Sequence, residues 1–199
     1  MPVRDPLIIR HYREKTIDAV AFFSKNTNYC GPLKLFKLLY FLDFINFRET
    51  GVSVTNLQYF AWKEGPIPQE LYHELYNPAG SGLRDYIGLK GNPDVRYRKQ
   101  SWKGFSYIEI FKQFDGIFFN KGEKRILTDL KKEFSDYYSE DMAEDTFLKN
   151  KPWENTYREK ANTKIDYMLS VDGSDNRQLQ IGEIIERQNE IEEIRRVLE

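Results

Sequence analysis

The sequence predicts a mainly α-helical protein, organised as a compact multi-helix domain with a small β-hairpin insertion and a C-terminal helix. Apolar side chains recur at helical spacing along most of the 199 residues, and glycine or proline marks the ends of several expected helices. The stretch from about residue 77 to residue 120 lacks this spacing. Hydrophobic residues make up 40% of the chain, which is enough to build a core and argues against a disordered protein.

The first two helices are separated by Gly31-Pro32. Residues 11–26 have an amphipathic pattern, and Pro32 is well placed to start the next helix. We expect that second helix over residues 33–50, with Gly51 ending it. Its segment LKLFKLLYFLDF is apolar almost all the way round, which is typical of a helix inside a core rather than on a surface.

A short helix, a turn and another helix are expected next. Thr55 can cap a short helix that runs through Trp62, because its hydroxyl can accept a hydrogen bond from the first turn. The glycine and prolines of Gly65-Pro66-Ile67-Pro68 predict a rigid turn. Pro68 is also a good first residue for a helix that runs through Tyr76.

The stretch from residue 77 to residue 120 is aromatic and β-branched in its second half. This composition predicts a small sheet or an irregular loop, with Asp115-Gly116 as a tight hairpin turn. Helical patterns return after it, and we expect helices over residues 122–134, 141–148, 152–161 and 181–199.

Composition excludes several classes of protein. The charges of the 30 basic and 31 acidic residues nearly cancel, so the protein has no overall positive field that would attract nucleic acid. We therefore do not expect nucleic acid as a partner. The single cysteine, Cys30, excludes an internal disulfide framework and a cysteine-cluster zinc site. No combination of acid, base and nucleophile indicates a catalytic centre. We therefore expect a protein that is not an enzyme and has no metal and no cofactor.

The N-terminal residues lack the apolar core of a signal peptide. No apolar run approaches the roughly 20 residues that span a bilayer. We expect a cytoplasmic protein that makes no contact with a membrane.

Asp43 is the unusual residue of the second helix. On a helical wheel Lys34 and Lys37 mark the side that reaches water, and Asp43 lies nearly opposite, on the core side. A buried carboxylate is costly unless it is well hydrogen-bonded. Two interpretations stay open: Asp43 accepts hydrogen bonds from backbone amides of the 52–55 turn or from the Trp62 indole, or it forms the floor of a partner-binding groove.

The region from the second helix onward resembles the Panacea, or SocA-like, antitoxin domain. The family is marked by a Lys-Leu-Leu-Tyr-Phe-x-Asp helix, then by tyrosine, alanine and tryptophan, then by Gly-Pro-x-Pro. The matching positions here are Lys37, Leu38, Leu39, Tyr40, Phe41, Asp43, Tyr59, Ala61, Trp62, Gly65, Pro66 and Pro68. FNKGEKRIL resembles the start of a later family helix, and Pro152-Trp153 resembles its closing pair.

The resemblance covers about residues 11–161. It implies an antitoxin domain at residues 1–161, followed by a linker and an amphipathic C-terminal helix at 162–199. Two departures stand out: TFLKNKPW lacks the histidine that many members carry before Pro-Trp, and the stretch from about residue 80 to 120 is longer and more aromatic than expected.

The resemblance also implies function. Family members are bacterial or phage-borne domains that neutralise toxins by direct binding, and one branch is an adaptor that delivers its toxin to a protease. We therefore expect an antitoxin whose partner is a toxin encoded by a neighbouring gene. The alternatives are a proteolytic adaptor and a phage-associated nucleic-acid-binding accessory protein.

The expected partner-binding surface combines the lysine side of the second helix, the segment that follows it and a basic-aromatic cluster within residues 96–107. Its members are Lys34, Lys37, Tyr40, Tyr59, Trp62, Gly65, Pro66, Arg96, Arg98 and Trp102. The residues assigned to the fold are Asp43, Pro68 and Trp153. For the basic-aromatic cluster, a solvated loop, a toxin contact and nucleic-acid binding all stay open.

The C-terminal helix carries an apolar stripe. It consists of Ile181, Ile184, Ile185, Ile191, Ile194 and Leu198. The stripe can pack on the protein's own core, associate with a second copy to form a homo-oligomer, or dock in a groove of a toxin.

Overall fold

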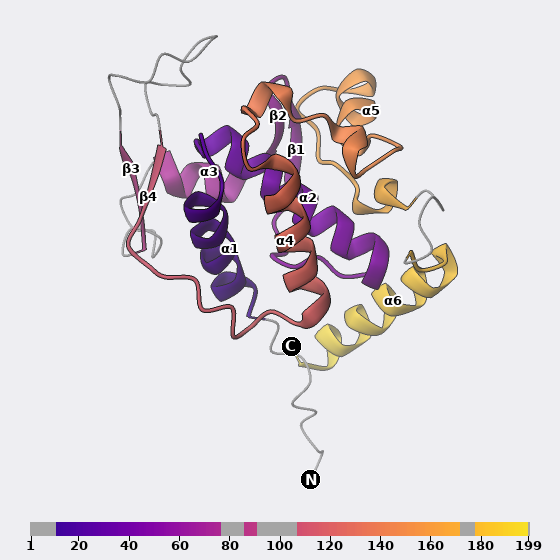
Figure 1. Ribbon diagram of the computed structural model, residues 1–199. Coiled ribbons are helices and arrows are strands. Elements are labelled where there is room, and N and C mark those ends of the chain that lie inside the picture. The colour runs from indigo at the N-terminus through magenta and orange to yellow at the C-terminus, as the bar shows by residue number, and fades with distance from the viewer. Residues whose placement is uncertain (1–10, 77–85, 91–106, 172–177, 199) are drawn as a thin grey trace.

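The computed structural model describes residues 11–76, 86–90, 107–171 and 178–198. Figure 1 shows helix α2 (Pro32–Thr50) in the middle of the molecule, with other elements around it. The other described α-helices are α1 (Tyr12–Asn26), α3 (Gln69–Tyr76), α4 (Lys121–Phe134), α5 (Pro152–Glu159) and α6 (Ile181–Leu198). The described residues also form three short 3-10 helices: η3 (Ser139–Asp141), η4 (Glu144–Thr146) and η5 (Tyr167–Ser170). The predicted mainly α-helical class is confirmed.

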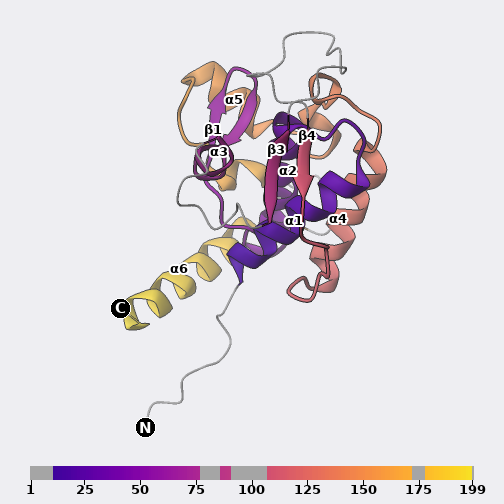
Figure 2. The same cartoon turned by 90° about the vertical axis from the view of Figure 1, so that its left-hand side faces the viewer.

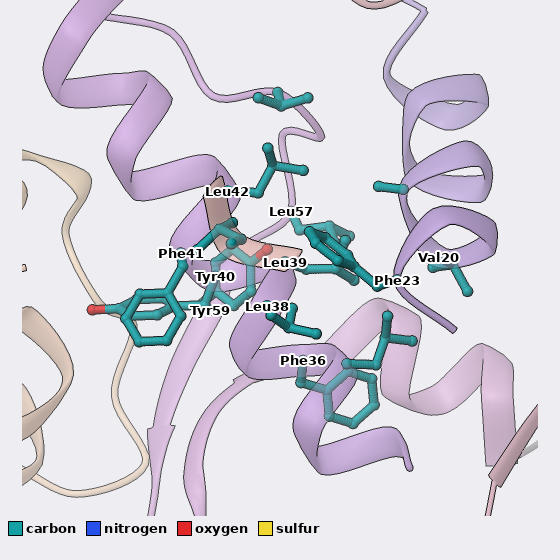
Figure 3. Packing of buried hydrophobic residues seen from close by; sticks show 14 of the residues in the cluster. Val20, Phe23, Phe36, Leu38, Leu39, Tyr40, Phe41, Leu42, Leu57 and Tyr59 are labelled. Carbon is teal, nitrogen blue, oxygen red and sulfur yellow. The ribbon is translucent and has the colours of Figure 1, made fainter. Parts of the chain in front are cut away.

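Helix α2 is surrounded by protein. Of its 19 residues, 15 are buried, as its nearly continuous apolar sequence predicts. Pro32 lies in its first turn, and Gly51 ends it in the left-handed conformation with φ of 72°. Val20 and Phe23 of α1 belong to the same buried cluster as the leucines of α2, and Figure 3 shows this region of the core. The core is therefore built around one helix.

Strands β1 (Tyr59–Trp62) and β2 (Gly65–Pro68) form an antiparallel hairpin. The helix predicted from Thr55 through Trp62 is therefore wrong. Burial alternates along β1, which is the period of a strand, and the Thr55 hydroxyl donates to Asp43. The turn predicted at Gly65-Pro66-Ile67-Pro68 is also wrong, because these residues are β2.

Strand β1 is paired on both sides, which explains how β2 accommodates two prolines. The N–H of Ala61 donates to the carbonyl of Thr163 over 2.9 Å, and the N–H of Ile165 donates to the carbonyl of Tyr59 over 2.8 Å. Strand β2 is thus at an edge, where proline is tolerated. Ile165 is completely buried, so residues beyond 161 contribute to the core. The domain division after residue 161 stays a prediction.

A second antiparallel pair, β3 (Ile87–Lys90) and β4 (Tyr107–Ile110), confirms the predicted small β-hairpin insertion. Figure 2 shows these two strands side by side, and β4 contacts α1. Asp115-Gly116 does not join them, so its assignment as a hairpin turn is wrong. It forms a local turn after β4, in which the Asp115 carboxylate accepts from the N–H of Ile117 over 3.0 Å.

The predicted helix over residues 141–148 is also wrong. In its place are the single turns η3 and η4, because Met142 and Ala143 between them have extended backbone conformations. Helices α4 and α5 lie where helical spacing predicted them. Helix α4 starts with a capping box between Asn120 and Glu123.

Helix α6 docks on the C-terminal end of α2. Ile184 is completely buried, and Arg187 donates to the carbonyl of Thr50 over 2.6 Å. Gln188 donates to the carbonyl of Gly51. Ile181 and Ile185 remain about half exposed, and Figure 2 shows the C-terminal part of α6 extending away from the other elements. One residue of the apolar stripe is therefore buried against the protein itself, and self-association stays a prediction.

Asp43 ties the segment after α2 to the helix. Its carboxylate accepts from the N–H groups of Val54 over 2.8 Å and Thr55 over 2.7 Å. It also accepts from the hydroxyls of Thr55 and Tyr59, the latter over 2.7 Å. Asp43 is completely buried. The backbone donors are those expected, whereas the aromatic donor is Tyr59 and not the Trp62 indole.

We predict that Asp43→Ala destabilises the protein by about 3–5 kcal/mol, because buried amides and hydroxyls lose their shared acceptor. Urea unfolding of the variant and the wild type measures this loss. Asp141→Ala removes an exposed carboxylate and serves as the control. A loss for Asp43→Ala no larger than that of the control would contradict the assigned role.

Stability should also depend on pH through Asp43. Burial raises the pKa of this carboxyl from 3.8 to about 6, because desolvation outweighs its hydrogen bonds. The folded state therefore binds more protons than the unfolded state between these values. The contribution of Asp43 to the free energy of unfolding should decrease by on the order of 3 kcal/mol as pH rises through that interval.

Comparing the pH dependence of urea unfolding for the wild type and Asp43→Asn measures this contribution. Other carboxyls with a raised pKa, such as Asp18 and Glu144, are present in both proteins and cancel in the difference. Equal slopes in the two proteins over this interval would show that Asp43 titrates normally.

Candidate functional site

A small pocket lies where α2, β2, the η3–η4 segment and the start of α5 meet. Its volume is about 30 Å³, which is room for one or two water molecules. Its lining residues are Lys37, Tyr40, Phe41, Pro66, Met142, Glu144 and Trp153. We call it the α2–α5 pocket. It brings together Lys37, Tyr40 and Pro66, three of the predicted partner-binding residues, with Trp153, which was assigned to the fold.

Glu144 is the polar centre of the α2–α5 pocket. Its carboxylate accepts from the Tyr40 hydroxyl and from the backbone N–H groups of Trp153 over 2.8 Å and Glu154 over 3.1 Å. Those N–H groups belong to the first turn of α5, where no helical carbonyl is available. Lys151, which precedes α5, makes no side-chain cap. Glu144 therefore caps α5 from a separate segment of the chain.

The ionisable groups of the pocket are shifted by burial. Desolvation raises the pKa of Glu144 and lowers the pKa of Lys37. Desolvation, followed by the charge of Glu144, also raises the pKa of Tyr40 well above its usual value. Tyr40 is therefore protonated at neutral pH and can donate its hydrogen bond to Glu144.

The β1–β2 hairpin is fixed to both neighbouring helices. The Trp153 indole of α5 donates to the carbonyl of Trp62 over 3.0 Å. Gly65 has φ of 142°, and a Cβ at this position would lie 3.0 Å from Cε of Lys37. Glycine therefore lets β2 approach α2 closely. The backbone conformation, more than this contact with a flexible side chain, explains why glycine occurs in the Gly-Pro-x-Pro motif of this chain.

The expectation that both lysines reach water is wrong for Lys34. Its side chain is completely buried, and its ammonium donates to the carbonyls of Asn28 over 2.7 Å, Ser135 over 3.2 Å and Tyr137 over 2.7 Å. The carbonyls, which lie just after the ends of α1 and α4, accept the hydrogen bonds of the ammonium in place of water. Lys37 is only partly buried and donates to the carbonyl of Ser139 over 2.7 Å.

The other predicted binding residues differ in exposure. Tyr40 and Tyr59 are almost completely buried, whereas Trp62 is partly exposed. Pro68, assigned to the fold, is the last residue of β2 and lies opposite Tyr59. Arg96, Arg98 and Trp102 lie outside the described residues. The binding role of these residues stays a prediction.

Sequence reasoning missed Glu144 and Met142. One signal was available for Glu144. The residue before Pro152, at the start of α5, is a lysine, and a lysine side chain cannot accept a hydrogen bond from the N–H groups of the first turn. An acceptor therefore had to come from another segment. Nothing in the sequence shows which carboxylate supplies it.

The described part of the chain contains no group of three or more His, Cys, Asp or Glu side chains that could hold a metal ion. Among the helices described, none has the length and apolar character to span a membrane.

The fold and the pocket define a mainly helical domain in which signature residues hold loops and helix ends in place. The family model described as "Antitoxin SocA-like, Panacea domain" matches residues 35–154, which is more than half of the chain. The protein belongs to this family. A search of curated proteins and a search of solved structures each gave no match.

We predict that Glu144→Ala destabilises the protein by about 1–3 kcal/mol, because two N–H groups of α5 and the Tyr40 hydroxyl lose their acceptor. Urea unfolding measures the loss. Glu140→Ala removes an exposed carboxylate of η3 and should change stability by less than about 0.5 kcal/mol. Equal effects of the two substitutions would refute the capping role of Glu144.

Proposed function

We propose that this protein is a cytoplasmic antitoxin that neutralises a toxin by binding it directly and catalyses no reaction itself. The observation that carries the proposal is the match of residues 35–154 to the SocA-like, Panacea antitoxin domain. The partner is a toxin protein, which we expect a neighbouring gene to encode.

The hydrogen bonds of the α2–α5 pocket support a binding role. Lys37, Tyr40 and Glu144 each bond to other groups of the protein, and a cavity of about 30 Å³ is too small for a drug-sized or cofactor-sized molecule. These contacts make loops and helix ends rigid. A rigid surface binds more tightly, because less conformational freedom is lost when the partner docks.

Expression of the neighbouring gene alone and together with this protein tests the proposal. We predict that the neighbour alone stops growth, that co-expression restores growth, and that the two proteins purify together as a stable complex. The half-life of the neighbour should stay unchanged or increase on co-expression.

Two other outcomes would overturn the proposal in different ways. Restored growth with rapid loss of the neighbour would indicate a proteolytic adaptor. A neighbour that is harmless alone and does not bind would remove the antitoxin function. In that case, binding of nucleic acid that weakens steeply with salt would favour the accessory-protein alternative.

A further inference from the structure

Three exposed tyrosines follow the C-terminal ends of α1 and α4, and two of them are in contact. Tyr29, Tyr137 and Tyr138 are 50%, 40% and 38% exposed. The rings of Tyr29 and Tyr138 stack with centroids 4.4 Å apart, and Tyr137 packs edge-on against Phe134. We call these three residues the tyrosine patch. Tyrosine is enriched among the residues that dominate binding energy at protein interfaces.

Hydrogen bonds from two lysines of α2 hold the loop that carries Tyr137 and Tyr138. Lys34 donates to the carbonyls of Ser135 and Tyr137, and Lys37 donates to the carbonyl of Ser139. Two lysines three positions apart on α2 thus bond to alternate carbonyls of the loop that carries Tyr137 and Tyr138. The loop is fixed before any partner arrives, which lowers the entropic cost of binding.

Tyr29 is held in an unfavourable conformation. Its φ is 56°, in the left-handed region that bulky residues rarely adopt. Backbone bonds secure the segment, since the N–H of Gly31 donates to the carbonyl of Tyr29 and the N–H of Asn28 donates to that of Ser135. The strained backbone presents the ring of Tyr29 to solvent, against Tyr138. Such strain is most often retained at functional sites.

The charge around the tyrosine patch indicates the kind of partner. Residues 135–146, SDYYSEDMAEDT, contain five acidic residues and neither lysine nor arginine. Asp136, Glu140 and Asp141 are exposed. The segment is therefore negative along its length, whereas the preceding turn of α4 carries two exposed lysines, Lys131 and Lys132. Interfaces place opposite charges against each other, which favours a partner surface rich in lysine and arginine.

We propose that the tyrosine patch, together with Asp136, Glu140 and Asp141, is the surface that docks a basic face of the toxin. This inference rests on the proposed antitoxin function and names the surface through which it operates. The tyrosines supply the buried anchors, and the carboxylates at the rim select a positively charged partner and accelerate its approach. Lys34 and Lys37 act as positioning residues beneath the loop.

The test measures binding of the purified protein to the purified product of the neighbouring gene. We predict that the double variant Tyr29→Ala/Tyr138→Ala lowers the affinity at least about 100-fold. The triple variant Asp136→Asn/Glu140→Gln/Asp141→Asn should lower the association rate about tenfold at low salt and make that rate less sensitive to salt.

Tyr86→Ala is the matched control. Tyr86 is 38% exposed, as Tyr138 is, but it precedes β3 in a different part of the chain. Its replacement should leave the affinity unchanged. Melting temperatures of all variants show whether a loss of binding reflects a loss of folding.

The positioning role of Lys37 has its own readout. Lys37→Met keeps the tyrosines but removes the hydrogen bond to Ser139. Exchange of the Asp141 amide, which donates to the carbonyl of Tyr138 across the turn that Lys37 holds, should become faster in the folded variant. The affinity should fall about tenfold, because the loop is no longer preorganised. Unchanged exchange and unchanged affinity would refute the positioning role.

The outcomes separate this inference from the antitoxin function. Loss of binding in folded tyrosine variants, with normal binding of Tyr86→Ala, supports the inference. Wild-type affinity in the tyrosine variants overturns the inference and leaves the antitoxin function intact. A wild-type protein that does not bind the neighbour at all overturns the antitoxin function, and the inference with it.

Discussion

The structure depends on one constraint: a helix buried on nearly all sides carries polar side chains whose hydrogen bonds must be made inside the protein. An unpaired charge in that position would cost several kcal/mol. The chain meets this requirement by bringing backbone groups of distant segments to α2. Lys34 donates hydrogen bonds to carbonyls at the ends of α1 and α4. Asp43 accepts hydrogen bonds from the amides of Val54 and Thr55. Arg48 donates to the carbonyl of Phe147. Each of these three residues of α2 thereby fixes a particular loop.

This constraint links the core to the surface. The two lysines hold the loop that carries Tyr137 and Tyr138, and the same loop continues through η3 to Glu144, which caps α5. The α2–α5 pocket and the tyrosine patch are therefore parts of one hydrogen-bonded framework. In such a framework, signature residues such as Lys37 and Tyr40 act from inside the protein, and the groups that we propose to meet a partner lie on the loop above them. A protein that binds without chemistry of its own needs this kind of rigidity.

How much the sequence predicts depends on whether the cause is local. Helix α2 was predictable because its apolar run and its boundaries, Pro32 and Gly51, lie within twenty residues of sequence. The β1–β2 hairpin was missed because four residues are too few to establish a period, and because β1 is stabilised by pairing with Thr163 and Ile165, about a hundred residues later. The helical wheel predicted wrongly that Lys34 reaches water. Its hydrogen-bond acceptors include the carbonyls of Ser135 and Tyr137, which are about a hundred residues away in sequence, so no local pattern indicates them.

Asp43 was placed correctly, because its carboxylate accepts from amides of the turn that directly follows α2.

Hydrogen exchange, measured on the protein alone and in complex with the product of the neighbouring gene, tests the central claim most directly. The claim is that buried polar groups of α2 hold a preformed surface loop, and that this loop meets the toxin. We predict slow exchange in the free protein at the amide of Asp141, which donates to the carbonyl of Tyr138, and further protection of residues 135–141 and of the segment around Tyr29 on binding. Fast exchange of the Asp141 amide in the free protein, or protection on binding confined to α6 or to residues 91–106, would contradict this claim.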